Sequence, residues 1–361
     1  MQKLMIHLRD RSYPVMIENG LLDQLGELVK AQIPTATRSF LISNATVDAF
    51  YGERAMKSLQ DAGLHPAKGL IPDGEEYKSL AEVMCLYDQL VAHGMDRSSV
   101  LISLGGGVVG DLAGFVAATY MRGLHFVQVP TSLLAQVDSS VGGKVAVNHP
   151  SGKNLIGVFH QPRLVIVDPV TLQTLSQEEL VAGLGEVIKH GMILNINYFD
   201  WVEANLERIL KKDPPTMEQV VFGSCTIKGK IVEADEQEQN LRAILNFGHT
   251  VGHALEIVTQ YRRYRHGEAV AIGMVQAARL SERLKMFNNR HVTRLVQVLK
   301  HAGLPVQIPS DVDPAAVIQA IHQDKKSFQG KTRFILPTAI GQVQITDQWD
   351  EQDLLEVLKG C

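Results

Sequence analysis

The chain has 361 residues, of which 45% are hydrophobic, 20% charged and 6% aromatic, and its formal net charge is -4. This is the composition of a globular protein of about two domains, and it excludes wholesale disorder and a coiled coil. Lys plus Arg (35) nearly balances Asp plus Glu (39), so we expect no nucleic-acid partner, which would usually require a basic face. The apolar runs are far shorter than the ~20 residues that span a bilayer, so we expect no membrane partner.

Three widely spaced cysteines, Cys85, Cys225 and Cys361, form neither a disulfide framework nor a thiolate metal site. We expect the thiols of Cys85 and Cys225 to be buried, because a free cysteine behaves as a small apolar residue. The first residues lack the apolar stretch of a signal peptide. Together these features predict a protein of the reducing cytoplasm.

The first half of the chain alternates strand-like and helix-like segments. The segments that predict strands are 1–8, 13–18, 38–43, 100–104, 125–129 and 164–168. The segments that predict helices are 45–62, 80–93 and the stretch from the glycines after residue 104 to Thr119. Strands that alternate with helices predict a mostly parallel sheet with helices on its faces.

From about Leu175 onward the pattern becomes helical. The predicted helices are 177–194, 198–210, 217–235, 249–258, 267–284 and 290–302. Prolines at 214–215 and 305–309 mark breaks, and 332–337 with 342–346 predict a late hairpin. We therefore predict an α/β domain at 1–174 and a helical domain at 175–361.

The segment Gly105-Gly106-Gly107-Val108-Val109-Gly110-Asp111 lies between a predicted strand and a predicted helix and satisfies the spacing G-x-G-x-x-G. In this context glycines let the backbone approach a phosphate, and the helix N-terminus offers free N–H groups; a tight structural turn is the alternative. The acidic residue that holds ribose about 20 residues further on is missing, because the next predicted strand ends at Pro130. If a dinucleotide binds here, Asn44 and the loop 72–78 are candidates to hold its ribose.

Two loops of small residues end in lysine, namely 138–144 and 151–153, the second followed by Asn154. Loops of this kind suit a phosphate or a polyol, although solvated lysines would look the same. Further on, Glu186 and Lys189 lie three residues apart and share one face of an otherwise apolar predicted helix. Such a charged pair indicates either a satisfied ion pair or a functional site.

The segment from Asn246 to Glu256 contains His249 and His253, which lie four apart on one helical face. A third histidine, His266, follows at the start of another predicted helix. Three histidines and the Glu186 carboxylate predict a Zn²⁺ site, and the spacing alone nominates both His249 and His253 as ligands. A surface histidine pair is the alternative interpretation.

These motifs resemble those of the 3-dehydroquinate synthases, which catalyse the second step of the shikimate pathway. The resemblance runs from about residue 15 to about 345 and rests on the order and spacing of 105–111, 138–144, 153–154, 186–189, 246–253 and 266–268. It implies an α/β N-terminal Rossmann-like domain that binds NAD⁺ and an all-α C-terminal metal-binding domain. Zinc is the implied metal, with cobalt as an alternative. Ser132 stands where a second threonine is common, and Gln239-Asn240 where a glycine is more usual.

The resemblance also implies roles for individual residues. The implied metal ligands are Glu186, His249 and His266, and His253 then contacts substrate instead. The implied catalytic residues are Asp138, Lys144, Lys189, Asn246 and His253. The implied substrate-binding residues are Arg122, Lys144, Lys153, Asn154, Lys228, Arg242, Asn246 and Lys325, the last chosen over Lys326. The implied NAD⁺-binding residues are Asn44, Asp73, Gly74, Glu75, Glu76, Tyr77, Lys78, Gly106, Gly107, Val108, Val109, Gly110, Asp111, Thr131, Ser132, Lys144, Lys153, Thr171, Leu172, Gln173 and Thr174.

The implied substrate is a small-molecule sugar phosphate, 3-deoxy-D-arabino-heptulosonate 7-phosphate. The implied reaction is transient oxidation at C4 by NAD⁺, β-elimination of phosphate, re-reduction, and aldol closure to 3-dehydroquinate, a precursor of chorismate and the aromatic amino acids. Arg122 resembles an arginine that reaches the substrate phosphate of a neighbouring subunit, so a homodimer is implied. The alternatives are a related sugar-phosphate cyclase, a metal-dependent polyol dehydrogenase, and a non-catalytic NAD-binding module.

Overall fold

The computed structural model describes residues 1–325 and 332–360, without the side chains of residues 324 and 325. The chain forms two compact units. The first unit contains Met1–Ser176 and Pro214–Gln237, and the second contains Gln177–Asp213 and Glu238–Cys361. The segment Pro214–Gln237 thus belongs with the α/β unit, whereas the sequence prediction placed it in the helical domain.

The first unit is built on a seven-stranded sheet in the order β1-β2-β9-β6-β5-β3-β4. The strands are β1 (Gln2–Ile6), β2 (Tyr13–Ile17), β3 (Arg38–Asn44), β4 (His65–Ile71), β5 (Val100–Gly105), β6 (His125–Pro130) and β9 (Leu164–Val167). Only the β1–β2 pair of this sheet is antiparallel, and every other neighbouring pair is parallel. The predicted parallel sheet is confirmed, and the carboxyl ends of its parallel strands lie at one edge.

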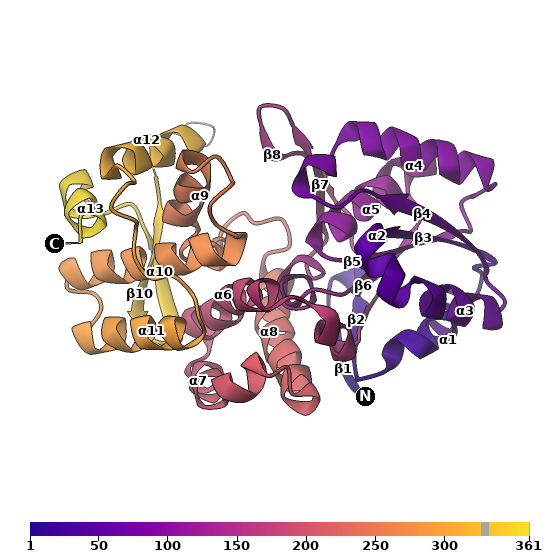
Figure 1. Cartoon of the computed structure of the whole chain (residues 1–361), viewed down its shortest axis with the longest axis horizontal. Coiled ribbons are helices and arrows are strands. Elements are labelled where there is room, and N and C mark those ends of the chain that lie inside the picture. The colour runs from indigo at the N-terminus through magenta and orange to yellow at the C-terminus, as the bar shows by residue number, and fades with distance from the viewer. Residues whose placement is uncertain (326–331, 361) are drawn as a thin grey trace. The chain divides into compact units, whose positions relative to one another are not determined.

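Helices cover both faces of this sheet (Figure 1). One hydrophobic core cluster joins α1 (Leu25–Gln32) and α3 (Glu53–Asp61) to one face. A second cluster joins α4 (Leu80–Ala92) and α5 (Gly107–Thr119) to the other. Within β3, Leu41 belongs to the first cluster while Phe40 and Ile42 belong to the second, as the alternation of side chains along a strand requires.

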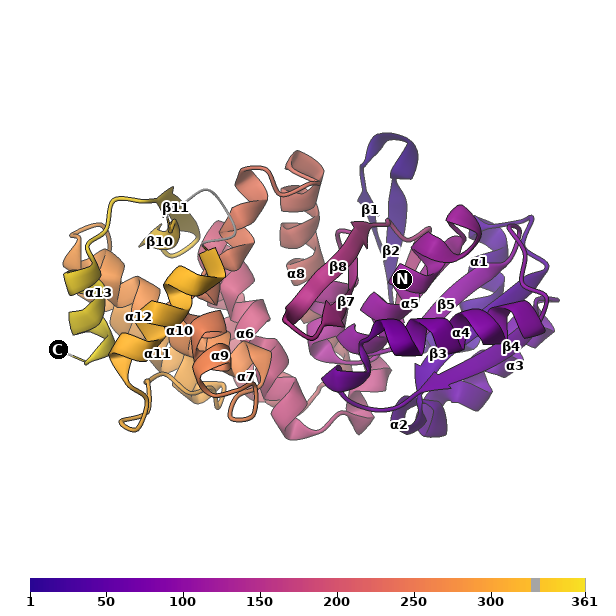
Figure 2. The ribbon, with the colours of Figure 1, turned by 90° about the horizontal axis from the view of Figure 1, so that it is seen from above.

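Three further elements complete the first unit. The strands β7 (Lys144–His149) and β8 (Gly152–Phe159) form an antiparallel hairpin outside the main sheet. Figure 2 shows this hairpin beside α5. Because Gly114 of α5 has no side chain, the side chain of Val145 on β7 can pack directly against the helix. The long helix α8 (Pro214–Ala234) begins at the two prolines that the sequence marks as a break, in keeping with the tolerance of proline in the first turn of a helix.

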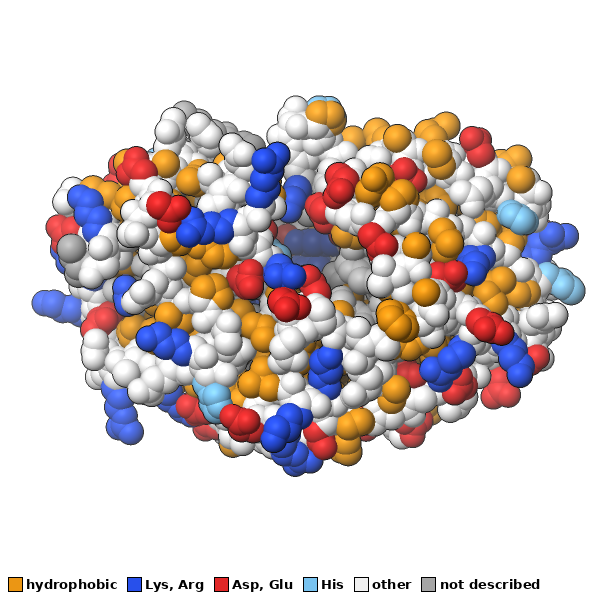
Figure 3. Space-filling model, in the orientation of Figure 1, with side chains coloured by type: hydrophobic (Ala, Val, Ile, Leu, Met, Phe, Trp, Pro, Cys, Tyr) orange, Lys and Arg blue, Asp and Glu red, His pale blue; other side chains and the backbone are white. Residues whose placement is uncertain are grey.

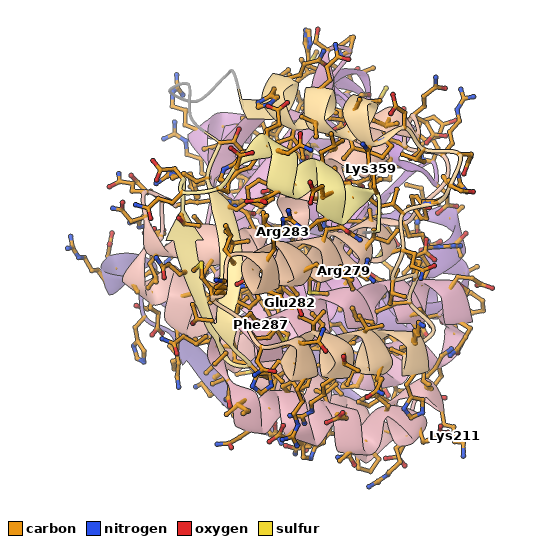
Figure 4. All side chains as sticks on the ribbon, turned by 90° about the vertical axis from the view of Figure 1, so that its left-hand side faces the viewer. Lys211, Arg279, Glu282, Arg283, Phe287 and Lys359 are labelled. Atoms are coloured by element: carbon orange, nitrogen blue, oxygen red, sulfur yellow. The ribbon has the colours of Figure 1, made fainter. Side chains whose placement is uncertain are left out.

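The second unit is mostly helical. Its helices are α6 (Gln177–Leu194), α7 (Ile196–Leu210), α9 (His249–Val258), α10 (His266–Arg283), α11 (Asn289–His301), α12 (Pro314–Lys325) and α13 (Glu351–Leu358). The strands β10 (Phe334–Ala339) and β11 (Gln342–Thr346) form the predicted late hairpin. Figure 4 labels Arg283 on the outer surface of this unit, where its Nε lies 2.5 Å from Oδ1 of Asp353 and joins α10 to α13.

Glycines let α6, α9 and α10 approach one another backbone to backbone. A Cβ atom on Gly267 of α10 would lie 1.8 Å from the carbonyl oxygen of Ala182 on α6, so only glycine fits at this crossing. A Cβ on Gly273 of α10 would lie 1.9 Å from the carbonyl oxygen of Gly248, immediately before α9. These contacts fix the first turn of α10 against α6, and the middle of α10 against the start of α9.

The structure departs from the sequence predictions at several elements. It adds β4, α1, the β7–β8 hairpin, α12 and α13, none of which the patterns predicted. Cys225 is buried as expected, but Cys85 is exposed. The expectation for Cys85 was wrong because α4 turns Val83, Leu86 and Leu90 toward the core and leaves residue 85 on its outer side. None of the helices described in 1–325 and 332–360 has the length and apolarity needed to cross a membrane.

Candidate functional site

The glycine-rich segment forms the predicted turn between β5 and α5. Gly106 is the N-cap of α5, and no side chain of the described residues caps this helix end. Cβ atoms on Gly106 and Gly107 would meet only the hydroxyl side chains of Ser132 and Ser139, at 3.4 and 3.3 Å. A helix N-terminus with uncapped N–H groups and small residues around it is a site that accepts phosphate oxygens.

The carboxyl ends of β3 and β4 supply the acidic group that is missing after β6. Asp73 follows β4, and its carboxylate accepts hydrogen bonds from the amide of Asn44, at the end of β3, and from the hydroxyl of Thr46 at 2.9 Å. Parallel strands bring these ends to the same sheet edge as the glycine turn. The loop that the sequence analysis named as a ribose candidate therefore lies at the position where an open α/β sheet binds ligands.

A buried lysine links this loop to α5 and to the β7–β8 hairpin. The Nζ atom of Lys78 lies 2.5 Å from Oδ2 of Asp111 and 2.5 Å from Oδ1 of Asn154, and the Lys78 side chain is only 4% exposed. Burial raises the pKa of Asp111, although the Lys78 charge opposes that rise. Asn154 adopts a left-handed backbone with φ of 58°. The contact brings three predicted ligand-binding residues together.

A second buried lysine holds Asp138. Nζ of Lys228, on α8, donates to both the carbonyl oxygen and Oδ1 of Asp138, each at 2.6 Å. Lys228 is 5% exposed, so this ion pair is largely shielded from water. The pair fixes a cation and a carboxylate in one place.

The remaining residues predicted in the first unit differ in their accessibility. Lys144, Lys153 and Arg122 are exposed, and no described side chain forms an ion pair with Arg122. Leu172 and Val109 are buried in the core, so only their backbone groups can face a ligand. The other predicted cofactor positions lie on loops and helix starts: Gly74, Glu75, Glu76, Tyr77, Val108, Gly110, Thr131, Thr171, Gln173 and Thr174.

The second unit brings Glu186, His249 and His266 together. Nε2 of His249 lies 3.7 Å from Oε1 of Glu186, and Nε2 of His266 lies 3.6 Å from the same oxygen. Glu186 is fully buried in the middle of α6, while the two histidines stand at the first positions of α9 and α10. One ligand atom from each of the three residues lies within 4.8 Å of the others.

The geometry of this cluster fits a tetrahedral metal ion. Ligands about 2.1 Å from a tetrahedral Zn²⁺ lie roughly 3.4 Å apart, close to the two nitrogen–oxygen distances observed. Neither carboxylate oxygen of the buried Glu186 has a hydrogen-bond partner among the described residues, although the ammonium of Lys189 forms an ion pair with it. Lys189 pairs with Oε2, which leaves Oε1 facing the imidazoles of His249 and His266, and together these three residues offer the donor atoms that zinc prefers.

The two histidines differ in their electrostatics. Burial, aided by the Lys189 ammonium, holds the pKa of His249 well below its usual value, so this imidazole is neutral and ready to bind a metal. For His266 burial acts in the same direction, but the carboxylates of Glu256 and Glu186 outweigh it and raise the pKa. A positive charge is therefore favoured beside His266, whether a proton or a metal ion supplies it.

Three more predicted residues lie in the second unit, and one of them, His253, stands beside the cluster. The ring of His253 lies 5.2 Å from that of His249 and 5.9 Å from that of His266, measured between centroids. Arg242 is 2% exposed, and Asn246 donates from its amide to Oε1 of Glu238 at 3.1 Å. The side chain of Lys325, at the end of α12, lies outside the described residues.

Sequence reasoning assigned no role to Glu238 or Glu256. Glu256 lies seven residues after His249 on α9, so helical periodicity could have indicated that the two residues share one face. Glu238 lies in the irregular segment before Leu241, with φ of 56°, and no sequence periodicity marks it. Only the structure brings its carboxylate to Asn246.

The fold, the glycine turn of the first unit and the Glu186, His249 and His266 cluster of the second unit define a class of protein. It is a metal-dependent enzyme with a nucleotide-binding type of α/β unit and a helical unit that contains this cluster. Residues 68–182 match the family described as 3-dehydroquinate synthase N-terminal, and residues 183–327 match 3-dehydroquinate synthase C-terminal. The chain belongs to the 3-dehydroquinate synthase family, as the resemblance in its motifs predicted.

Known proteins agree with this assignment. The chain is 48% identical over 358 residues to the 3-dehydroquinate synthase of Desulforamulus reducens, and the matched region covers 99% of each of the two chains. Among solved structures, a 2-deoxy-scyllo-inosose synthase complexed with carbaglucose-6-phosphate, NAD⁺ and Co²⁺ has a TM-score of 0.89 at 27% identity and covers 99% of this chain and all of its own. A 2-epi-5-epi-valiolone synthase from Streptomyces hygroscopicus with NAD⁺ and Zn²⁺ bound has a TM-score of 0.89 at 25% identity and covers 98% of both chains.

Proposed function

We propose that this chain is a carbon–oxygen lyase that converts 3-deoxy-D-arabino-heptulosonate 7-phosphate into 3-dehydroquinate and phosphate, the second step of the shikimate pathway. The observation that carries the proposal is the Glu186, His249 and His266 cluster in a chain of this family. The related sugar-phosphate cyclases remain the alternative, but the chain shares far more sequence with a dehydroquinate synthase than with either cyclase structure.

In this proposal Glu186, His249 and His266 hold Zn²⁺, and Co²⁺ also serves. When bound, the metal supplies Lewis-acid polarisation of a substrate hydroxyl. Three protein ligands leave one position open for that hydroxyl, which a purely structural site would not do. Lys189, buried beside Glu186, and His253, beside the histidine pair, then contact the sugar and orient it.

NAD⁺ is proposed to bind the glycine turn at the start of α5 and the Asp73 loop. Its chemistry is to accept the hydride from C4 of the substrate and later to return it. The uncapped N-terminus of α5 supports the pyrophosphate assignment, because three or four N–H groups there lack partners within the helix. The Asp73 carboxylate, held by Asn44 and Thr46, supports the ribose assignment.

The remaining residues act as a cationic clamp. Lys144, Lys153, Lys228 and Arg242 supply the positive charges that a carboxylate and a phosphate require, and Asn154 and Asn246 supply neutral donors. Lys228 is held by Asp138 and Asn154 by Lys78 before any ligand arrives, so their geometry is set in advance. Because the phosphate oxygen can itself remove the C5 proton, the clamp contributes mainly by positioning.

The direct test is to incubate the purified protein with NAD⁺, Zn²⁺ and the heptulosonate phosphate, and to measure phosphate and 3-dehydroquinate together. We expect equimolar formation of both products, with no net change in NAD⁺. Sedoheptulose 7-phosphate and glucose 6-phosphate, which lack the carboxylate, serve as controls. Release of a cyclised product from either control, with none from the heptulosonate, would replace the proposal with a related cyclase.

We further propose that the protein is a homodimer in which Arg122 reaches the substrate phosphate of the other subunit. Support comes from the apolar side chains of β8, since Leu155 is 63%, Val158 42% and Phe159 39% exposed, and from Met121, which is 44% exposed beside Arg122. Apolar side chains exposed together on one hairpin indicate a surface that a second copy covers.

Mixing two inactive variants tests this arrangement. In a heterodimer of Arg122→Ala and Lys144→Ala subunits, an Arg122 that acts across the interface leaves one site intact, so activity returns on mixing. Loss of the arginine alone should weaken substrate binding about 10- to 150-fold, which corresponds to roughly 1.5–3 kcal/mol for a contact to a charged group. If subunits exchange and no activity returns, Arg122 acts within its own chain.

The proposal also places the protein in the cytoplasm. Cys85 and Cys225 are free thiols on separate elements of the first unit, one exposed and one buried. Free thiols are characteristic of a reducing compartment.

A further inference from the structure

Glu256 of α9 is a buried carboxylate that no step of the proposed function uses. The residue is 6% exposed, and its Oε1 lies 3.5 Å from Nδ1 of His266. The other ring nitrogen of His266, Nε2, lies 3.6 Å from Oε1 of Glu186. The imidazole thus stands between two carboxylates, each of which faces a different nitrogen.

The helix α9 places Glu256 in this position by its periodicity. His249, Gly252, His253 and Glu256 follow one another at the spacings i, i+3, i+4 and i+7, so they share one face. A Cβ on Gly252 would lie 3.1 Å from the carbonyl oxygen of Ala269, and this close approach presses the shared face against the first turns of α10. His266, the first residue of α10, therefore meets a carboxylate about two turns along α9.

The other histidine of the cluster has a comparable partner. Nδ1 of His249 lies 3.2 Å from the carbonyl oxygen of Phe247, while its Nε2 faces Glu186. Histidines that bind metals usually donate their second N–H to a carboxylate or a backbone carbonyl, which fixes the tautomer and the ring orientation. Phe247 fills this role for His249, and the carboxylate of Glu256 occupies the equivalent place beside His266.

We propose, on the basis of the metal centre in the proposed function, that Glu256 is a positioning residue for the metal. Its carboxylate accepts the Nδ1–H of His266 and thereby directs the Nε2 lone pair toward the ion that Glu186 and His249 share. The separation of 3.5 Å lies about 0.3 Å beyond the usual range of an N–H···O hydrogen bond.

A rival assignment uses the same residues. His253, Glu256 and His266 also place one ligand atom each within 4.8 Å of one another, so they could hold a second cation. The positioning role is favoured because His266 has one nitrogen directed at each carboxylate, and its Nε2 belongs to the Glu186 cluster. The number of metal ions bound per chain separates the two assignments.

The test compares Glu256→Gln and Glu256→Ala with the unaltered protein and with a control, Glu207→Gln. Glu207 pairs with His301 at 2.8 Å on the exposed surface of the same unit, so the control removes a glutamate–histidine contact of the same chemistry away from the cluster. The measurements are Zn²⁺ affinity by chelator competition, metal content per chain, the visible spectrum of bound Co²⁺, and the melting temperature of the metal-free protein.

We expect Zn²⁺ to bind about 10-fold more weakly to Glu256→Gln, whose amide oxygen still accepts a hydrogen bond, and up to ~100-fold more weakly to Glu256→Ala. The Co²⁺ spectrum should shift in both variants, and the melting temperature of metal-free Glu256→Gln should match that of the control. If Glu256→Ala does not fold, the Gln variant carries the test by itself.

Three results would overturn the inference, and each has a separate meaning. Unchanged Zn²⁺ affinity in the Glu256 variants, with a lower melting temperature of the metal-free form, would make Glu256 merely structural. Two metal ions per chain in the unaltered protein, reduced to one in Glu256→Gln, would establish the second cation site. No metal in the unaltered protein would remove the proposed centre itself, independently of Glu256.

Discussion

Replacing Gly267 by alanine tests how closely the metal cluster depends on the packing of α6 against α10. The added Cβ would lie 1.8 Å from the carbonyl oxygen of Ala182. An ordinary carbon contact is ~3.5 Å, so the two helices must separate by roughly 1.7 Å at this crossing. Gly267 directly follows His266, and Glu186 lies one turn beyond Ala182 on α6.

We expect Gly267→Ala to affect metal binding more strongly than it affects the stability of the fold. Overpacking of this kind costs about 1–3 kcal/mol or more, and the higher helix propensity of alanine returns at most ~1 kcal/mol. We therefore expect a net loss of roughly 1–2 kcal/mol in the free energy of unfolding. Metal–ligand distances, however, tolerate only ~0.2 Å, so a shift of His266 away from Glu186 should abolish tight binding.

Alanine substitutions at other glycines of the same helices serve as a comparison, because the added Cβ meets the neighbouring backbone at different distances. The Cβ atom added by alanine would lie 1.9 Å from its nearest backbone oxygen at Gly273, 2.6 Å at Gly185 and 3.1 Å at Gly252. We expect the loss of Zn²⁺ affinity and of unfolding free energy to follow this order, with Gly252→Ala the mildest. Chelator competition measures the first quantity and urea denaturation the second. Equal Zn²⁺ affinity in Gly267→Ala and Gly252→Ala would refute the argument that backbone contact sets the cluster.

Two further predictions concern the first unit. Gly107→Val should weaken NAD⁺ binding in calorimetry while the protein stays folded, since the nearest atom to the added Cβ is the Ser139 hydroxyl at 3.3 Å; unchanged affinity would make the turn purely structural. In a Cys361→Ser background, a thiol reagent at pH 8 should modify Cys85 quickly and Cys225 only on unfolding, because burial raises the pKa of the Cys225 thiol to about 12 and the thiolate is the reactive form. Rapid modification of two thiols in the native protein would contradict the burial of Cys225.

Much of the candidate site could be read from local patterns. The glycine turn, the buried strand before it and the helix after it each have a strong signature within a few residues, and the structure places them as expected. His249 and His253 share a helical face by spacing alone, and so does Glu256, whose role the sequence analysis did not identify. Glu186 was marked because a charged residue stood in an apolar helix.

The missed elements have weak or mixed patterns. The strand β4 contains Pro66, Lys68 and Gly69 within seven residues, and its pairing with β3 in the sheet supplies the order that its sequence does not. The β7–β8 hairpin has a largely exposed second strand, so no buried alternation marks it. Because β4 was not predicted, the sequence analysis could not explain why Asp73 stands at the sheet edge.

The sequence by itself determined which chemical groups this protein carries, namely a glycine turn before a helix, a set of cations, three histidines and a glutamate in an apolar helix. The residues nominated His249, His253, His266 and Glu186 together for a zinc site, and only the resemblance to a family moved His253 from the metal to the substrate. The tertiary structure decided the geometry, because Glu186 and His266 are far apart in the chain and meet where Gly267 lets α10 touch the backbone of α6. Periodicity reports one element at a time, whereas a metal site depends on distances between elements, and here those distances are set by the contact of two helix backbones.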